Sequence, residues 1–335
     1  MNEDQHTLSR RHFFVRSGAA ILTTGLLTSC ESLISDILPS KDKPKDALPE
    51  RDKTLAFFGD SLTIGAGGSA PYGTLVGAAL PGRPIVSDGI VGQIALSISI
   101  RQGGTPLIIS VEGNKFKGAE PVKVTKLNNE FLSTPINYET YKRTGKIAGV
   151  VCTITRTASS DVGESYTITP DAASDAEIPA DSEFVLTDTI PLKTATQILW
   201  FGRNNIGKDG AEQEILDSLD KSVAYITEPR RYLVLGVLLA VPEIKGTDRY
   251  NQVTGINEKL SAKYGNAFVP MTPPTAEEMA AINYSPTDED RRDLENLNWP
   301  TGMRPADKTD DIHINDIGYQ IVANRVVEKI KGIRD

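Results

Sequence analysis

Residues 54–63 read Thr54-Leu-Ala-Phe-Phe-Gly-Asp-Ser-Leu-Thr63, and the fold and the chemistry of this chain both depend on them. An apolar run comes first and stops abruptly at Gly59-Asp60-Ser61. A continuous apolar run is typical of a strand buried on both faces, as in a parallel sheet. Gly59 permits a tight turn after the strand, and such a turn would expose the hydroxyl of Ser61. The alternative is a polar strand-to-helix turn in which Asp60 or Ser61 only caps the helix.

Further apolar runs follow along the chain, and stretches with helical periodicity lie between them. The runs cover residues 84–87, 197–201, 232–240 and 267–270. The helical stretches cover 209–226, 251–264 and 316–333, and the last of them carries on one face Ile317, Ile321, Val322, Val326 and Ile330. Strands that alternate with helices predict a doubly wound α/β sheet. In such a sheet the chemistry lies at the carboxyl ends of the strands.

The region 105–195 departs from this pattern. It contains short segments rich in Thr, Val and Ile, separated by Gly, Pro, Asp and Ser, at 122–125, 149–156, 166–169 and 184–187. This composition predicts a small antiparallel β domain, because a structureless connection of this length would be unusual in a compact fold. We therefore expect a main domain built from 54–104 and 196–335, with 105–195 inserted into it.

Only one histidine lies outside the N-terminal stretch of the chain, and it is His313. A serine hydroxyl needs a base to become a nucleophile, so an imidazole that activates Ser61 would have to be His313. Asp310 lies three residues before it, where a carboxylate could fix the tautomer of the ring. The alternative is a loop in which Asp310 and Asp311 cap the start of the C-terminal helix.

Two other loops after predicted strands carry candidate donors to an oxyanion. Asn204, within Gly-Arg-Asn-Asn at 202–205, could donate its side-chain amide. Within Asp-Gly-Ile-Val-Gly-Gln at 88–93, a glycine would let a backbone N–H approach a ligand closely. Asn-rich turns and loop glycines are also common without any chemistry, so the residues alone leave both motifs open.

These motifs, taken in order over residues 59–313, are similar to the four blocks of SGNH (GDSL) hydrolases. The resemblance implies that Ser61 is the nucleophile and that its backbone N–H, the N–H of Gly92 and the amide of Asn204 form an oxyanion hole. Asp310 and His313 match the last block. Gly89 aligns one turn earlier than Gly92 and looks structural, although an exchange of roles between the two glycines stays open.

The same resemblance implies a flavodoxin-like sheet and a carboxylic ester hydrolase that needs no metal and no organic cofactor. The stretch 92–104, followed by the β insertion, resembles a subgroup from bacterial and phage-tail proteins that acts on acylated polysaccharides. We therefore expect removal of O-acetyl groups from a polysaccharide. The alternatives are a lipase, lysophospholipase or thioesterase, and a catalytically silent glycan-binding lipoprotein. One departure is Asn205, where the family often has Asp, and it puts a secondary hydrogen bond in doubt.

The N-terminus resembles an export signal followed by a lipid anchor. Arg10-Arg11 before His-Phe-Phe resembles a twin-arginine signal. The apolar stretch that follows is too short to span a bilayer, and it ends in Leu-Thr-Ser-Cys30, which resembles a lipobox. We expect 1–30 to be a signal peptide, Cys30 to be lipidated, and the protein to be anchored in a bacterial cell envelope, in the periplasm or on the cell surface. The alternative is a hydrophobic N-terminal helix with an ordinary buried cysteine.

Charge and composition limit the kinds of binding partner that we expect for this protein. Residues 31–53 are rich in Lys, Asp, Glu and Pro without apolar periodicity, which predicts a flexible tether. The formal net charge is −8 and basic residues form no long run, so we expect no nucleic-acid binding. No Cys/His cluster has metal-ligand spacing. If Cys30 carries lipid, Cys152 has no partner and we expect it to be a small buried apolar residue.

Overall fold

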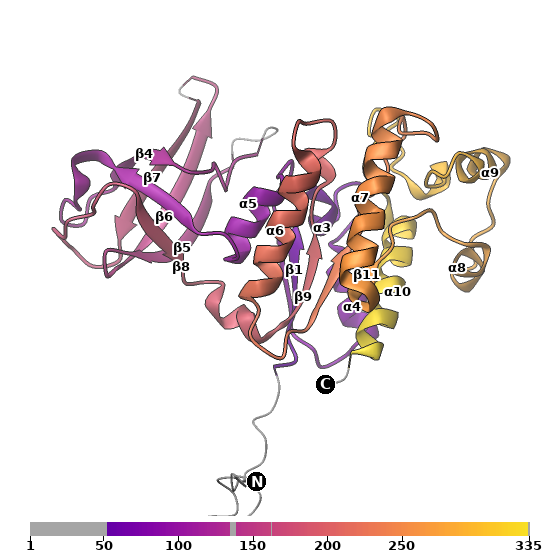
Figure 1. The fold of residues 1–335 in the computed structure, drawn as a ribbon, viewed down its shortest axis with the longest axis horizontal. Helices are drawn as coiled ribbons and strands as arrows, with labels where there is room; N and C mark the ends of the chain where they lie inside the picture. The colour runs from indigo at the N-terminus through magenta and orange to yellow at the C-terminus, as the bar shows by residue number, and fades with distance from the viewer. Residues whose placement is uncertain (1–51, 135–138, 162, 334–335) are drawn as a thin grey trace, which may run out of the picture. The chain divides into compact units, whose positions relative to one another are not determined.

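The computed structural model describes residues 52–134, 139–161 and 163–333 (Figure 1). The predicted signal peptide, the lipidated Cys30 and all but the end of the predicted tether lie outside the described residues. None of the helices in the described ranges has the length and apolarity needed to cross a bilayer.

Five parallel strands form the central sheet. They are β1 (Leu55–Gly59), β2 (Ile85–Gly89), β9 (Thr196–Trp200), β10 (Tyr232–Leu235) and β11 (Phe268–Val269). Their spatial order is β11-β10-β9-β1-β2, with β1 pairing in parallel with both β2 and β9. Counted along the chain within this sheet, the order is the 2-1-3-4-5 of a flavodoxin-like fold. The predicted doubly wound parallel sheet is therefore confirmed.

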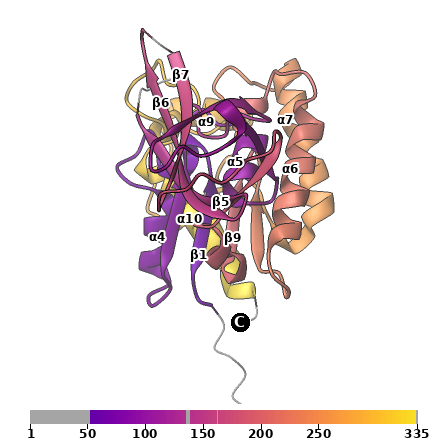
Figure 2. The same ribbon diagram turned by 90° about the vertical axis from the view of Figure 1, so that its left-hand side faces the viewer.

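Helices cover both faces of the sheet, as Figure 2 shows for α4 on one side and for α6 and α7 on the other. The helices are α3 (Ser61–Ile64), α4 (Tyr72–Ala79), α5 (Ala95–Gln102), α6 (Ala211–Tyr225), α7 (Asp248–Tyr264), α8 (Ala276–Ala281), α9 (Asp288–Glu295) and α10 (Asp316–Gly332). Side chains of β1 alternate between two cores. Leu55 and Phe57 pack into the core that α4 and α10 cover, whereas Ala56 and Phe58 pack against α5, α6 and α7. Burial on both faces explains the continuous apolar run.

Two details of the expected elements are wrong. The fourth apolar run ends as a strand at Leu235, although 236–240 stays largely buried. Side chains satisfy the backbone of that segment in place of a neighbouring strand, since Asn257 bonds both the N–H and the carbonyl of Val237. In addition, Ile317 is 38% exposed and does not share the buried face of α10. It is the second residue of the helix and lies in its first turn.

The inserted region folds as a separate six-stranded antiparallel barrel, which confirms the predicted β domain. Its strands are β3 (Leu107–Val111), β4 (Val122–Leu127), β5 (Tyr141–Ile147), β6 (Val150–Ser159), β7 (Gly163–Pro170) and β8 (Ser182–Leu186), closed in the order β3-β4-β7-β6-β5-β8. The barrel has a core of its own, which Ile90 and Ile100 of the main domain join. Cys152 is a free, fully buried member of that core, and burial raises the pKa of its thiol to about 12.

Candidate active site

Ser61 lies at the turn where β1 ends and α3 begins. Gly59 is required there, because a Cβ at this position would lie 2.0 Å from Thr63 Oγ1 and 2.8 Å from the carbonyl oxygen of Trp200. Asp60 is the N-cap of α3, and its Oδ1 accepts the N–H of Leu62 at 3.0 Å. The capping role considered for Asp60 is thus real. It leaves the neighbouring hydroxyl of Ser61 directed elsewhere.

The Ser61 hydroxyl meets the imidazole of His313, although 252 positions separate the two residues in the chain. Ser61 Oγ and His313 Nε2 are 2.8 Å apart, and His313 Nδ1 lies 2.7 Å from Asp310 Oδ2. The other oxygen of Asp310 accepts the backbone N–H groups of Ile312 and His313 at 3.2 and 3.0 Å. The three predicted residues therefore form one continuous chain of hydrogen bonds.

The alternative reading of Asp310 and Asp311 as helix caps is wrong, because Asn315 caps α10 through its Oδ1. Burial raises the pKa of Asp310, but the backbone and side-chain hydrogen bonds from His313 outweigh it and leave this pKa below its ordinary value. Asp310 is therefore a carboxylate near neutral pH. A carboxylate can only accept, so Nδ1 carries the ring proton and Nε2 faces Ser61 as an acceptor.

Asn204 lies beside the same turn, at the end of β9. Its Nδ2 donates to Asp60 Oδ2 at 2.9 Å and to the carbonyl oxygen of Gln93 at 3.0 Å. Both amide hydrogens of Asn204 thus have acceptors within the protein. Donation to a bound substrate would share or replace one of these two bonds.

The two candidate glycines after β2 differ in what they require. Gly89 pairs with Gly59 in the sheet, and a Cβ on Gly89 would lie 2.6 Å from the carbonyl oxygen of Asp60. Gly89 is therefore needed for the close approach of β2 to the Ser61 turn. Gly92 lies in the loop after β2, next to Gln93, and has a positive φ of 75°. Such a φ disfavours other residues.

Two polar residues around the site, Asn205 and Arg101, were not predicted as functional. Asn205 accepts the N–H of Ala95 at 2.9 Å and donates to Glu214 at 2.7 Å, so it holds the start of α5 together with a carboxylate from α6. An asparagine fits this position because its amide can donate to Glu214, which an aspartate could not do. Arg101, fully buried in α5, is the other omission. The sequence feature that could have indicated Arg101 is a single charged residue directly after the uncharged stretch 94–100.

The buried carboxyl of Asp60 gives the site a measurable pH dependence. Burial raises its pKa from the ordinary 3.8 to about 6, although hydrogen bonding to Leu62 and the charges of His313 and Arg203 act in the opposite direction. As the pH falls, the folded protein therefore binds this proton at a higher pH than the unfolded chain does. Stability from this group is fully present below about pH 4 and is lost as the pH rises through about 6.

An Asp60→Asn variant removes this titration and keeps an acceptor for the N–H of Leu62. We expect the free energy of unfolding of the wild type, minus that of Asp60→Asn, to rise by on the order of 2 kcal/mol between about pH 7 and pH 4. Thermal or urea unfolding across that range measures it. A difference that stays flat with pH would show that Asp60 titrates as it does in the unfolded chain.

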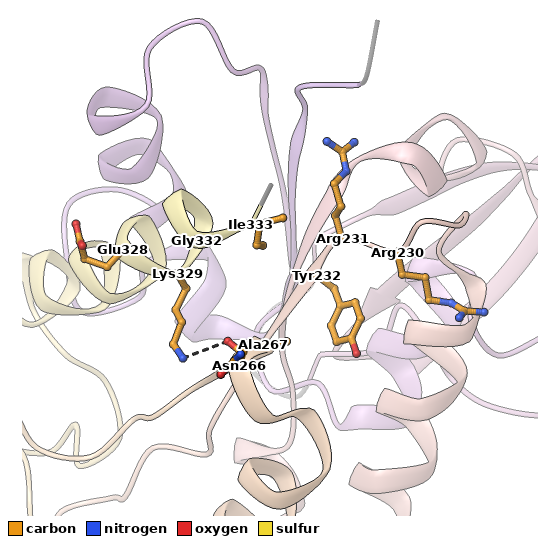
Figure 3. A pocket seen from close by; sticks show the side chains of 9 residues that line it. All are labelled: Arg230, Arg231, Tyr232, Asn266, Ala267, Glu328, Lys329, Gly332 and Ile333. Atoms are coloured by element: carbon orange, nitrogen blue, oxygen red, sulfur yellow. Dashed lines mark hydrogen bonds between the residues drawn. The ribbon is translucent and has the colours of Figure 1, made fainter. Parts of the chain in front are cut away.

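Cavities also lie outside the immediate site. One of about 420 Å³ surrounds Tyr232 at the amino end of β10, between Arg231 and Lys329 (Figure 3). Because the strands are parallel, it opens at the edge opposite Ser61 and is not part of the site. A second cavity, of about 650 Å³ and lined mainly by apolar side chains, lies between α7, α8 and α9 and includes Leu239 and Met271. Within the described ranges, no three His, Cys, Asp or Glu side chains are grouped to hold a metal ion.

Comparison with known proteins gives matches to solved structures. No family model matches the sequence, and no curated protein matches it significantly. A G-D-S-L family protein from Desulfitobacterium hafniense is 9% identical with a TM-score of 0.43, over 83% of this chain and 99% of its own. A member of the lipolytic protein G-D-S-L family from Veillonella parvula is 13% identical with a TM-score of 0.40, over 84% and 99%. An alpha/beta hydrolase enzyme from the metagenome of Lake Arreo, Spain, is 12% identical with a TM-score of 0.41, over 84% and 96%.

Proposed function

We propose that this chain is a serine ester hydrolase in which Ser61 is the nucleophile, His313 the base and Asp310 the carboxylate that orients the base. The observation that carries the proposal is the pair of short hydrogen bonds from Ser61 through the imidazole to Asp310. The strand order supports it as well. Ser61 follows β1 and Asn204 follows β9, and the sheet reverses its order between these strands, where doubly wound folds bind their ligands.

In the proposed reaction, His313 Nε2 takes the proton of Ser61 as Oγ attacks the ester carbonyl. The carbonyl oxygen becomes an oxyanion, which accepts hydrogen bonds from the N–H groups of Ser61 and Gly92 and from the amide of Asn204. The alcohol leaves with the proton from His313. Water then attacks the acyl-enzyme with His313 again as base, and the acid leaves as Ser61 regains its proton.

An Asn204→Ala variant is expected to lower kcat about 100-fold with a small change in KM, because one oxyanion donor is lost. Steady-state hydrolysis of p-nitrophenyl acetate measures this. Asn205→Ala is the matched control, since Asn205 bonds Ala95 and Glu214 rather than the Ser61 turn. We expect the control to lower thermal stability more than kcat. Equal losses of kcat in both variants would contradict the assignment of Asn204 as an oxyanion donor.

The substrate class proposed here is an O-acetylated polysaccharide. Support comes from the inserted barrel domain, which contacts the segments next to the site through Arg143, bonded to Asp88, and through Phe131 and Ser133, bonded to Gln93. A second candidate is a hydrolase of longer acyl chains. The apolar cavity between α7, α8 and α9 favours it, because its lining includes Val237, Leu239 and Met271, which follow the carboxyl ends of β10 and β11.

Two measurements test the function. Mass spectrometry after treatment with a fluorophosphonate probe is expected to find one adduct, on Ser61. Incubation with acetylated polysaccharides is expected to release acetate, whereas release of fatty acid from lipid esters would favour the second candidate. A wild-type protein that forms no adduct and hydrolyses no ester would overturn the proposal and leave a glycan-binding protein as the remaining reading.

For the N-terminal region we propose export by the twin-arginine route and anchoring through lipid on Cys30 in the cell envelope. The support is the order of the arginine pair, the apolar stretch and Cys30 in the sequence. Replacement of Cys30 by Ala is expected to move the protein from the membrane fraction to the soluble fraction. Membrane association that survives the replacement would contradict the anchor.

A further inference from the structure

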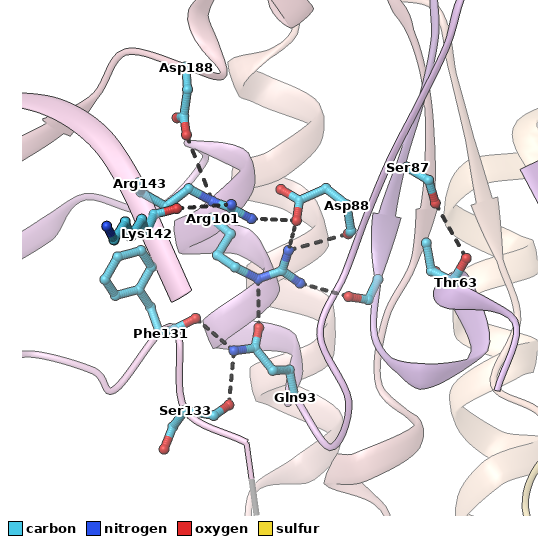
Figure 4. A network of polar contacts seen from close by, with 11 residues as sticks. Thr63, Ser87, Asp88, Gln93, Arg101, Phe131, Ser133, Lys142, Arg143 and Asp188 are labelled. Carbon is cyan, nitrogen blue, oxygen red and sulfur yellow. Dashed lines mark hydrogen bonds and ion pairs between the residues drawn. The ribbon is translucent and has the colours of Figure 1, made fainter. Parts of the chain in front are cut away.

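A buried arginine lies directly beneath the proposed site. Arg101 is the penultimate residue of α5, and its side chain is fully buried. Figure 4 shows its guanidinium at the centre of a network of polar contacts. An arginine stays charged even when buried, and its planar fork of donors fixes the direction of each bond. Whatever accepts these bonds is therefore held in a defined place.

The acceptors belong to three segments that meet at the site. Nη2 donates to the carbonyl oxygen of Gly59, two residues before Ser61, at 2.7 Å. Nη1 donates to the carbonyl oxygen of Asp88 at 3.2 Å and also to its carboxylate. Nε donates to Oε1 of Gln93 at 2.7 Å. Arg101 thus ties the end of β1 to the end of β2 and to the loop that carries Gly92.

Residues of the inserted barrel domain also bond to members of this network. Arg143 of β5 donates to the carboxylate of Asp88 at 2.5 Å, so this carboxylate lies between two guanidinium groups. Gln93 donates through its side-chain Nε2 to the carbonyl oxygens of Phe131 and Ser133 at 2.7 and 3.0 Å. The backbone carbonyl of Gln93 in turn accepts from Asn204. One continuous set of contacts therefore runs from the barrel to Asn204, one of the candidate oxyanion donors.

From these contacts we infer that Arg101 is a positioning residue, which sets the Ser61 turn and the Gly92 loop at the separation that ester hydrolysis needs, with the barrel bracing the loop. The inference rests on the proposed function for its kinetic consequence. Arg101 touches no substrate. It acts through Gly59, Asp88 and Gln93, whose backbone carries the residues that do.

The test replaces Arg101 by Met, which keeps much of the volume and loses every donor. Because a displacement of about 1 Å at a reacting centre can cost about 100-fold in rate, we expect kcat on p-nitrophenyl acetate and the rate of fluorophosphonate labelling to fall about 100-fold. KM is expected to change less than about threefold. Arg101→Lys, which can restore some of the bonds, is expected to recover part of the loss.

Arg231→Met is the matched control. Arg231 is also buried and donates to two carbonyl oxygens, those of Asp52 and Thr194, but it lies at the opposite edge of the sheet. Both Met variants are expected to lose thermal stability, and only Arg101→Met is expected to lose kcat. Equal losses of kcat in the two variants, or labelling of a folded Arg101→Met protein at the wild-type rate, would overturn the inference.

Hydrogen exchange provides a readout that does not depend on activity. Peptides covering 59–65 and 88–94 are expected to exchange faster in Arg101→Met than in Arg231→Met, and Arg101→Lys serves the same comparison if the Met variant does not fold. Unchanged exchange in these peptides would overturn the inference. A wild-type protein that never reacts with the probe would instead overturn the proposed function, so the two failures remain distinct.

Discussion

A Ser61→Ala variant is expected to lose at least about 10⁴-fold in kcat on p-nitrophenyl acetate while keeping its fold. Without the hydroxyl, His313 has no proton to accept and no acyl-enzyme can form. The residual rate would come from water acting beside the oxyanion donors. The hydroxyl contributes one side-chain contact, to His313, so its loss should cost only about 1 kcal/mol in stability. Steady-state kinetics and thermal unfolding of the purified variant measure both quantities.

Ser69→Ala is the control for this variant. Ser69 Oγ donates to Asp316 at 3.1 Å, close to the start of α10, and takes no part in the chain of bonds through His313. Its kcat is expected to stay within about twofold of wild type, as for an exposed substitution that breaks no buried contact. Full activity in Ser61→Ala would assign the hydrolysis, and any adduct, to a different nucleophile.

The parts of the fold that could be predicted are those in which local chemistry and tertiary structure agree. The strand before Ser61 is apolar at every position, and its side chains reach two cores on opposite faces of the sheet. The fourth run, 232–240, looks the same in sequence, yet its second half is not a strand. Its backbone is bonded instead by Asn257 and Arg203, residues far away in the chain. No property of the run itself distinguishes these two cases.

Some residues of the candidate site could also be predicted from the sequence, and others could not. Ser61, His313 and Asp310 could be found because each lies in a short motif, and because one histidine remains outside the N-terminal stretch. Arg101 and Asp88 could not, since their role depends on three segments and a barrel strand meeting in space. The resting contacts of Asn204 were also beyond reach. They arise only once Asp60 and Gln93 lie beside it.

Asp310→Asn is expected to lower kcat on the order of 10³- to 10⁴-fold with a small effect on the fold. The amide keeps an oxygen for the N–H groups of Ile312 and His313, so the turn can persist. Its NH₂ group, however, would face Nδ1 of His313 where a carboxylate oxygen now accepts. Nδ1 must then accept, the ring proton moves to Nε2, and Nε2 can no longer take the proton of Ser61.

Asp311→Asn separates this tautomer effect from a general loss of negative charge near His313. Asp311 is exposed, and its structural contact is a backbone one, in which its carbonyl oxygen accepts the N–H of Val241 at 2.7 Å. The control is therefore expected to keep kcat within about twofold of wild type. The two variants change net charge equally, so only Asp310→Asn should lose most of its activity. If both lose activity to the same extent, Asp310 acts as a distant charge, and the imidazole must be oriented by something else.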